Sequence, residues 1–423
     1  MSTQDLTHTK QGNNEGKIEM SFLRSPARRS VLRVTGVVVA VGLATAGSSA
    51  YAFAAGTGSG QKASGQKASG RAVSGQPPAG LQQAADQLVA DGVPGVIIMT
   101  RRGQQVSNVV AGLADKATGQ PMQPQDQVRI GSITKTFVAT VVLRLAAERR
   151  LSLNDSVQKW LPGVITGHGY HPARITIRQL LQQTSGIQDY TSAPGFFTEA
   201  NLAKTWQPQQ LVDIALGLGP PVHGWLYSDT NYILLGMIIQ KVTGQSPITE
   251  ISRRILVPLG LHDTSFPLTS KQIPAPYAHG YYGSLDATNL LNPSIAWTSG
   301  AMISTVDDVA WFYRALLDGR LLPPAQQREL LTTIPVDDTG ELFAEHYGLG
   351  IYSVKLSCGT AWGHDGGILG FKTFAYTSPD GNRQAVIVYN DYKKSVPPPA
   401  GTGTAAFQRD VKKATEIAFC GKG

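Results

Sequence analysis

The stretch Arg129-Ile130-Gly131-Ser132-Ile133-Thr134-Lys135-Thr136-Phe137 decides the fold of this chain. It indicates the end of an extended segment, a glycine, and the first turn of a helix whose apolar face continues to Leu145. Ser132 and Lys135 are three residues apart, so they lie on one face of that turn. A lysine held there, with apolar protein on its other side, could take the proton of the serine. The pair is a candidate nucleophile with its own base, although a helix-capping serine and a surface lysine would give the same pattern.

The composition is that of a globular protein with a nearly neutral main part. The chain has 423 residues, enough for two or three domains, and 42% of them are hydrophobic. The formal net charge is +8, but residues 1–80 hold nine Lys or Arg and three Asp or Glu, which leaves +2 for the remaining 343 residues. No basic patch interleaved with aromatic side chains occurs in the sequence, so we expect no nucleic-acid partner.

The N-terminus is typical of an export signal. A polar lead ends at Arg28-Arg29, an apolar run follows from residue 34 to 46, and small residues after it offer cleavage sites near Ala52. The run is short for a membrane span, and the arginine pair resembles a twin-arginine signal. We therefore expect residues 1–54 to be a signal peptide and the protein to be secreted. An uncleaved membrane anchor is the alternative.

The rest of the chain divides into a linker and one folded unit. Residues 55–80 are rich in Gly, Ser and Ala and repeat Gly-Gln-Lys-Ala-Ser in tandem, so we expect a flexible linker. Folded structure is expected over 81–420, with strand patterns over 81–130 and 340–420 and mostly helical patterns over 131–339. This predicts an α+β fold, in which an antiparallel sheet from both ends is flanked by helices and a mainly helical domain is inserted.

The two cysteines, Cys358 and Cys420, are a candidate disulfide, because an even number of cysteines in an exported protein is normally paired. The bridge would connect the C-terminal helix to the strand region just before His364. Two buried free thiols are the alternative.

Two more motifs follow Ser132-x-x-Lys135 along the chain. Tyr227-Ser228-Asp229 stands just before a helix, and Trp362-Gly363-His364-Asp365-Gly366-Gly367 leads into a strand. Each alone is weak, because a capping turn and a turn histidine would look the same. In order and separation, however, the set resembles the penicillin-recognising serine hydrolases, the family of serine β-lactamases and D-alanyl-D-alanine carboxypeptidases. The branch with class C β-lactamases has Ser-x-x-Lys, then Tyr-x-Asn, then Lys-Thr-Gly or His-x-Gly.

The resemblance covers about residues 82 to 420 and implies the β-lactamase/transpeptidase-like fold. It also implies an exported serine hydrolase without metal or cofactor that forms an acyl-enzyme, is secreted or associated with the cell wall, and acts as a monomer. The most direct function is that of a D-alanyl-D-alanine carboxypeptidase acting on peptidoglycan peptides and reacting with β-lactams. The alternatives are an esterase or β-lactamase of this family, and a penicillin-binding sensor that acylates without turnover.

The resemblance assigns a role to each matched residue. Ser132 is the nucleophile, Lys135 and Tyr227 move its proton, and the backbone N–H groups of Ser132 and Gly367 form the oxyanion hole. The residues expected to bind substrate are Asp229, His364, Asp365, Gly366 and Trp297.

Several of these positions leave the function open. Asp229 stands where the family has Asn, and an ionised aspartate only accepts hydrogen bonds and would hold Lys135 in its protonated form. Asp365 stands where the family has Thr, and its carboxylate would repel a terminal carboxylate of the substrate unless it is turned away. Both changes favour an esterase over a peptidase unless His364 supplies a positive charge. Trp297 either lines the pocket or belongs to the core.

Two other hydrolase classes fit the sequence poorly. An α/β-hydrolase needs a Gly-x-Ser-x-Gly pentad after a strand, and the sequence has none. A zinc hydrolase needs a ligand cluster, but His168 and His171 occur without a His-Glu-x-x-His motif and fit a loop. We therefore expect no metal site.

Overall fold

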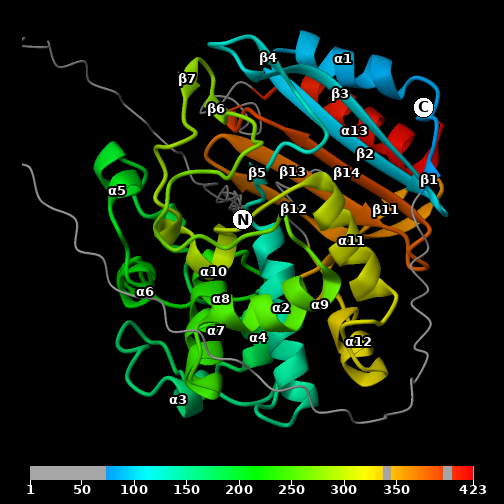
Figure 1. Cartoon of the computed structure of the whole chain (residues 1–423). Helices are drawn as coiled ribbons and strands as arrows, with labels where there is room; N and C mark the ends of the chain where they lie inside the picture. Colours follow the sequence, from blue (N-terminus) through cyan, green and yellow to red (C-terminus); the bar gives the residue numbers. More distant parts are fainter. Residues whose placement is uncertain (1–72, 337–343, 394–402, 423) are drawn as a thin grey trace, which may run out of the picture. The chain divides into compact units, whose positions relative to one another are not determined.

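The computed structural model describes residues 73–336, 344–393 and 403–422 (Figure 1). The expected signal peptide, residues 1–54, and the linker up to residue 72 lie outside this part. Among the described helices, none combines the length and the apolar character that crossing a membrane requires.

The centre of the fold is a ten-stranded sheet built from both ends of the described chain. The strands follow the order β1-β3-β2-β14-β13-β12-β11-β10-β9, with β4 beside β3. Neighbours are antiparallel except for β1 and β3. The predicted antiparallel sheet is confirmed, and the β2–β14 pair joins its N-terminal and C-terminal halves. The strands are β1 Val73–Ser74, β2 Gly95–Arg102, β3 Gln105–Asp115, β4 Gln120–Pro121, β9 Ile334–Pro335, β10 His346–Tyr347, β11 Tyr352–Leu356, β12 Gly359–Ile368, β13 Phe371–Thr377 and β14 Arg383–Tyr389.

The linker prediction is wrong at its C-terminal end, because β1 lies inside the expected range 55–80. Val73 and Ser74 pair with the backbone of Gln105 and Val106, and the Ser107 hydroxyl donates to the Gly75 carbonyl at 2.7 Å. A strand of two residues has no detectable alternation of polar and apolar side chains, so the composition alone indicated a linker.

Helices cover both faces of the sheet. α1 (Leu81–Ala90) and α13 (Ala405–Cys420) contact each other and pack on one face, while α11 (Val306–Leu317) packs against β13, β14 and β2 (Figure 1). Central strands are therefore buried on both faces. On β14, for example, Ala385 and Ile387 belong to the core below α1 and α13, whereas Val386 and Val388 belong to the core shared with the helical part.

The inserted part is mostly helical, as predicted, and surrounds one central helix. α2 (Ile133–Ala147) contacts α7, α8, α10, α12 and β12, and 12 of its 15 residues are buried. The single apolar face predicted for this helix is therefore wrong, because a helix surrounded by protein is buried all round. The other elements here are α3 Val157–Trp160, α4 Ile177–Leu181, η1 Tyr190–Ser192, α5 Glu199–Ala203, α6 Pro208–Gly217, α7 Asp229–Thr243, α8 Pro247–Ile251, η2 Ser252–Leu256, α9 Val257–Leu259, η3 Pro293–Ile295, α10 Trp297–Gly300, α12 Pro324–Leu330, and the short strands β5 Val128–Arg129, β6 Tyr281–Tyr282, β7 Leu285–Asp286 and β8 Ile303–Ser304.

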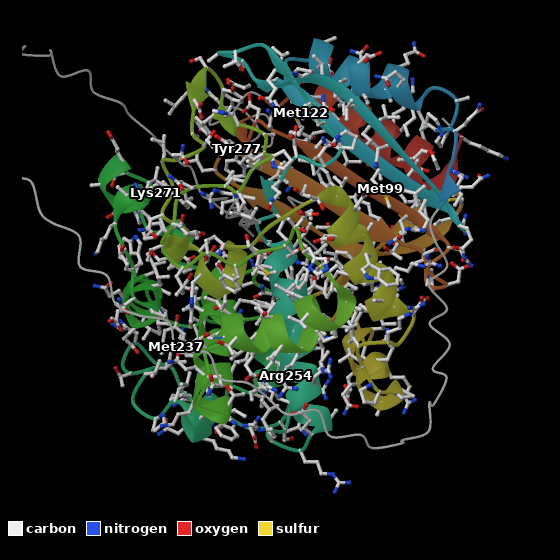
Figure 2. The ribbon with its side chains drawn as sticks, viewed as in Figure 1. Met99, Met122, Met237, Arg254, Lys271 and Tyr277 are labelled. Atoms are coloured by element: carbon white, nitrogen blue, oxygen red, sulfur yellow. A yellow bond between two sulfur atoms is a disulfide. The ribbon has the colours of Figure 1, made fainter. Side chains whose placement is uncertain are left out.

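A buried ionic cluster fixes the C-terminal end of α2. Arg254, labelled in Figure 2, lies in the π-helical turn η2. It donates to the fully buried Glu250 at 2.6 Å and to Glu148 at the end of α2. Arg253 donates to Glu250 as well. A buried carboxylate needs such partners, because an unpaired charge in the interior is strongly destabilising.

The predicted disulfide is present. Cys358, in the turn between β11 and β12, is bonded to Cys420 at the end of α13, with Cα atoms 5.6 Å apart. The bridge therefore ties the C-terminal helix to the strand that carries His364.

Candidate active site

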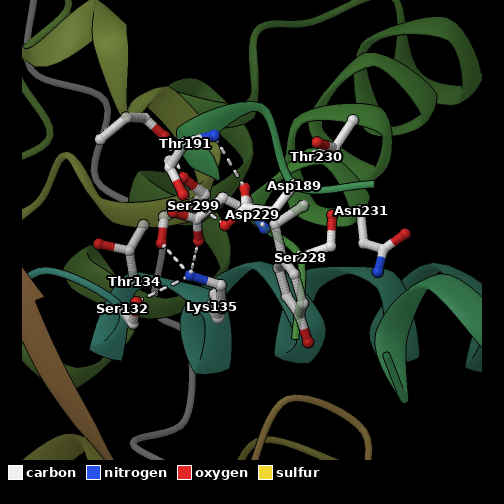
Figure 3. A network of polar contacts seen from close by, with 12 residues as sticks. Ser132, Thr134, Lys135, Asp189, Thr191, Ser228, Asp229, Thr230, Asn231 and Ser299 are labelled. Carbon is white, nitrogen blue, oxygen red and sulfur yellow. Dashed lines mark hydrogen bonds and ion pairs between the residues drawn. The ribbon is translucent and has the colours of Figure 1, made fainter. Parts of the chain in front are cut away.

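Ser132 precedes α2 and points toward the lysine one turn later. Gly131 adopts a φ of 50°, which directs the chain into the helix, and Ser132 makes no capping hydrogen bond with its side chain. The Ser132 hydroxyl instead accepts a hydrogen bond from Lys135 Nζ at 2.8 Å (Figure 3). The structure thus brings together the two residues on which the sequence interpretation depends, in a contact that a plain capping serine would not make.

Lys135 is buried, with 0% of its side chain exposed, and it has three acceptors. Its Nζ lies 2.8 Å from Ser132 Oγ, 2.5 Å from Asp229 Oδ1 and 2.9 Å from the Ser299 carbonyl oxygen (Figure 3). An ammonium group has three N–H donors, so this geometry fits the protonated lysine. To accept the serine proton, Lys135 must first lose a proton.

Gln183 positions the segment with Tyr227 and Asp229. Its backbone adopts a φ of 64°, and its carbonyl accepts from the Leu226 N–H at 2.9 Å. Its buried side-chain oxygen accepts from the Ser228 N–H at 3.1 Å and from Asn231 Nδ2 at 2.5 Å. These three bonds fix both sides of Tyr227 and the first turn of α7.

Tyr227 is a neutral phenol beside Ser132 and Lys135. Burial, more than the neighbouring Tyr347 and Asp229, raises its pKa well above the usual value, and a hydrogen bond with Ser132 opposes this only partly. Lys135 Nζ lies 4.9 Å from the ring centre. Tyr227 can therefore donate a proton to a leaving group, because its anionic form is disfavoured.

Strand β12 lies against the start of α2 at its two consecutive glycines. A Cβ on Gly366 would be 1.9 Å from the Ile130 carbonyl oxygen and 3.3 Å from the Ser132 nitrogen. A Cβ on Gly131 would be 2.9 Å from the Gly367 nitrogen. The Ser132 N–H makes no hydrogen bond to any other residue that the structure describes. This close approach is what an oxyanion hole of the Ser132 and Gly367 amides requires.

His364 is a neutral, buried side chain. Its Nδ1 lies 2.6 Å from the Asp365 carbonyl oxygen, which can only accept, so Nδ1 bears the proton and Nε2 accepts from the Tyr347 hydroxyl at 3.1 Å. Burial lowers the pKa of His364 to about 4, against a smaller opposing effect of the Asp365 carboxylate. The positive charge expected at this position is therefore not available near neutral pH.

Asp365 does not face a substrate either. Its buried carboxylate is paired with Lys372 and accepts from the Tyr352 hydroxyl at 2.9 Å. Its cross-strand neighbour Phe374 belongs to the core below α1 and α13, and directly opposite residues share one face of a sheet. The strand thus directs the Asp365 carboxylate to an ion pair on the core side of the sheet, which does not fit the substrate-binding role predicted for it.

Trp297 belongs to the core rather than to a pocket wall. Its side chain is buried, and its ring would lie 2.8 Å from a Cβ on Gly236 in α7. Its backbone has a φ of 33°, which is strained for a bulky residue. Trp297 is the first residue of α10, and the Ser299 carbonyl of this helix accepts a hydrogen bond from Lys135.

The sequence interpretation missed Asp189, a second carboxylate next to Asp229. Asp189 Oδ1 accepts from the Asp229 N–H at 3.3 Å and from the Thr191 N–H at 3.2 Å (Figure 3). Burial, followed by the charge of Asp229, raises the pKa of Asp189 to about 7. No spacing rule connects residues forty positions apart, so only a motif ending in Asp189 could have revealed it.

Among the residues that the structure describes, no three His, Cys, Asp or Glu side chains are grouped as metal ligands would be. His168 and His171 are exposed in turns.

Comparison with known proteins assigns the family. A sequence model described as Beta-lactamase matches residues 81–407. The chain belongs to the β-lactamase family. A structure described as a D-stereospecific amidohydrolase from Streptomyces sp. has 39% sequence identity and a TM-score of 0.72, with 82% of this chain and 100% of that one covered. D-amino acid amidase from Ochrobactrum anthropi SV3 has 27% identity and a TM-score of 0.70, with 79% and 96% covered.

A third relative is penicillin-binding protein 4* of Bacillus subtilis, which is 26% identical over 317 residues, covering 70% of this chain and 68% of that protein. Together these findings confirm the family and the β-lactamase/transpeptidase fold predicted from the motifs. The chain is a serine hydrolase of this fold, related to penicillin-binding proteins and D-amino acid amidases.

Proposed function

We propose that this protein is a D-stereospecific amidohydrolase that forms an acyl-enzyme on Ser132. The observation that carries the proposal is the charge of the β12 motif. His364 is buried and neutral, and Asp365 is paired with Lys372, so the motif offers no free cation to a terminal carboxylate. This favours amides without such a carboxylate. The similarity to the Streptomyces amidohydrolase, which covers that whole chain, supports the D-stereospecificity.

The reaction follows from the contacts around Ser132. Lys135, once it has lost a proton, accepts the Ser132 proton, while Oγ attacks the carbonyl carbon and forms the new ester bond. The amides of Ser132 and Gly367 bind the oxyanion, an effect of about 100-fold or more per donor in related chemistry.

The second half of acylation uses the neutral phenol. Tyr227 donates its proton to the leaving nitrogen as the C–N bond breaks, and Lys135 returns a proton to Tyr227. Water then repeats the sequence on the ester. It gives a proton to the Lys135–Tyr227 pair as its oxygen bonds to the acyl carbon, and the bond between that carbon and Ser132 Oγ breaks as Ser132 recovers the proton.

A second candidate is the D-alanyl-D-alanine carboxypeptidase that the motif order implies, acting on cell-wall peptides. The relation to penicillin-binding proteins supports it. Lys372 is a cation beside Gly367, since its Cδ would lie 3.7 Å from a Cβ there, but it would have to leave Asp365 to bind a substrate carboxylate.

Export is part of the proposal. The Cys358–Cys420 bridge supports a secreted or cell-wall-associated protein, because disulfides persist in oxidising compartments. N-terminal sequencing and intact mass of the protein in a culture supernatant test this directly.

The decisive experiment compares kcat/KM for p-nitroanilides of D-alanine and L-alanine, free and N-acetylated, with that for a diacylated peptide ending in D-Ala-D-Ala. We expect the wild-type protein to hydrolyse only the p-nitroanilides of D-alanine, and the Ser132→Ala variant to hydrolyse none of the substrates. If the peptide is hydrolysed far better than every anilide, the carboxypeptidase is the correct function. If the wild-type protein hydrolyses none of these substrates, both proposals are wrong.

A further inference from the structure

The Asp229 carboxylate lies close to the position where the acyl group must bind. Its Oδ1 is 2.5 Å from Lys135 Nζ, which in turn is 2.8 Å from Ser132 Oγ. The side chain is 22% exposed, so it is not sealed off from the site. Two consecutive contacts therefore connect an accessible carboxylate with the nucleophile.

This part of the site has more negative than positive charge. Asp189 lies behind Asp229 and accepts from its N–H at 3.3 Å, and Lys135 is the one cation that forms an ion pair with either carboxylate within the described residues. Asp189 itself is bound to Thr191 and to the backbone, which are neutral groups. When both carboxylates are ionised, one negative charge has no counter-ion. A bound cation would be stabilised there.

The residue type at position 229 decides which substrates can use this charge. An asparagine can donate to a carbonyl oxygen, such as that of an acyl group on the α-nitrogen of a substrate, whereas an ionised aspartate can only accept. A free α-ammonium group is a donor with a full positive charge. It is two bonds from the carbonyl carbon that Ser132 attacks, so it must bind in the neighbourhood of the nucleophile.

We propose that Asp229, supported by Asp189, selects acyl donors with a free α-ammonium group over donors whose α-amine is acylated. The inference rests on the proposed amidohydrolase function and specifies its substrate class as D-aminoacyl amides. Asp229 contacts the substrate, and Asp189 acts through it by orienting its backbone and by adding negative charge.

A purely structural role for the two carboxylates makes a different prediction. If Asp189 only held the start of α7 in place, its loss would weaken the hydrolysis of every substrate by a similar factor. The ratio between a charged and an uncharged substrate separates the two cases, because it cancels damage common to both.

The experiment measures kcat/KM for D-alanine p-nitroanilide and N-acetyl-D-alanine p-nitroanilide near pH 7. The wild-type protein should prefer the free amine. Asp229→Asn should reduce this preference by about 10- to 100-fold, the range of one hydrogen bond to a charged group, and Asp189→Asn should reduce it less. Asp213→Asn, which removes an exposed carboxylate on α6, is the matched control and should keep the wild-type ratio.

A wild-type comparison keeps the inference testable if the variants do not fold. Isobutyryl p-nitroanilide replaces the ammonium group of D-alanine with a methyl group of similar size, and it should be a much poorer substrate. If the wild-type protein hydrolyses all three anilides at similar rates, the amidohydrolase function stands and the inference is wrong. An unchanged ratio in folded Asp229→Asn would also overturn it. If no anilide is hydrolysed, the proposed function itself fails.

Discussion

Removing the imidazole of His364 should make the folded protein less sensitive to acid. The ring is 1% exposed, and both of its nitrogens have partners that fit only the neutral form. Protonation would place a second N–H against the Tyr347 hydroxyl and a charge in the interior. Burial therefore lowers the pKa from 6.5 to about 4.

The size of the effect follows from the two pKa values. Between pH 6.5 and 4 the unfolded chain binds a proton at this position and the folded chain does not, so the free energy of unfolding decreases as the pH falls. The complete effect is about 3.4 kcal/mol, and about 2 kcal/mol of it should be lost by pH 5. The stabilisation is fully present above pH 6.5.

The assay is urea unfolding of the oxidised wild-type protein and of His364→Gln, at pH 8 and pH 5. Any loss of packing in the variant is the same at both pH values, so only the change in the difference matters. Wild-type stability relative to the variant should fall by about 2 kcal/mol between pH 8 and pH 5. Asp189, whose pKa of about 7 is raised, titrates in this range with the opposite sign, but it is present in both proteins.

His171→Gln is the control, since His171 is exposed in a turn. This variant should follow the wild-type pH dependence. If the free energies of unfolding of His364→Gln and the wild type instead change by the same amount between pH 8 and pH 5, His364 is protonated as easily in the folded as in the unfolded chain. The neutral tautomer between Asp365 and Tyr347 would then be wrong.

Four further outcomes are expected. Ser132→Ala should abolish covalent labelling by a fluorophosphonate or a labelled penicillin, which mass spectrometry of the digested protein would detect. Replacing Cys358 and Cys420 with Ala should lower the free energy of unfolding by about 4 kcal/mol, because the bridge spans 62 residues. Glu250→Gln should cost about 3 kcal/mol in urea unfolding, since it removes the carboxylate that pairs with two arginines. Gly366→Ala should slow labelling by about 100-fold, because its Cβ would displace the backbone of Ile130.

The arrangement of the sheet could be predicted because its signals are local. Turn residues occur at Arg102-Gly103 and at residues 379–382, and each turn lies between two segments with a strand pattern. These segments form the hairpins β2–β3 and β13–β14. That both ends of the chain contribute to one sheet was inferred from the order of the patterns, with strands at both ends and helices between them. β1 could not be predicted. Its two residues are extended because they pair with the edge of β3, and two residues are too few to show an alternating pattern.

The part of the candidate site that lies on one helix could be predicted from the sequence. Ser132 and Lys135 are three residues apart, and a helix turns that spacing into a contact. Asp189 and the Ser299 carbonyl are distant in the sequence and were not predicted to lie near Lys135. The protonation state of His364 could not be predicted from the sequence either. Its pKa depends on burial between Asp365 and Tyr347, which only the folded chain defines.

The two aspartates that depart from the family motifs show why residue type alone does not give the charge of a site. Asp229 and Asp365 carry the same carboxylate, and both changes were expected to favour an esterase over a peptidase. The fold gives Asp365 a lysine on its own face of the sheet and thereby cancels its charge. Asp229 pairs with Lys135 but also contacts a second carboxylate, Asp189, so when both are ionised the excess negative charge lies near the nucleophile and not at the position of a leaving carboxylate. Electrostatic discrimination by Asp229 should therefore act on the amine end of the substrate.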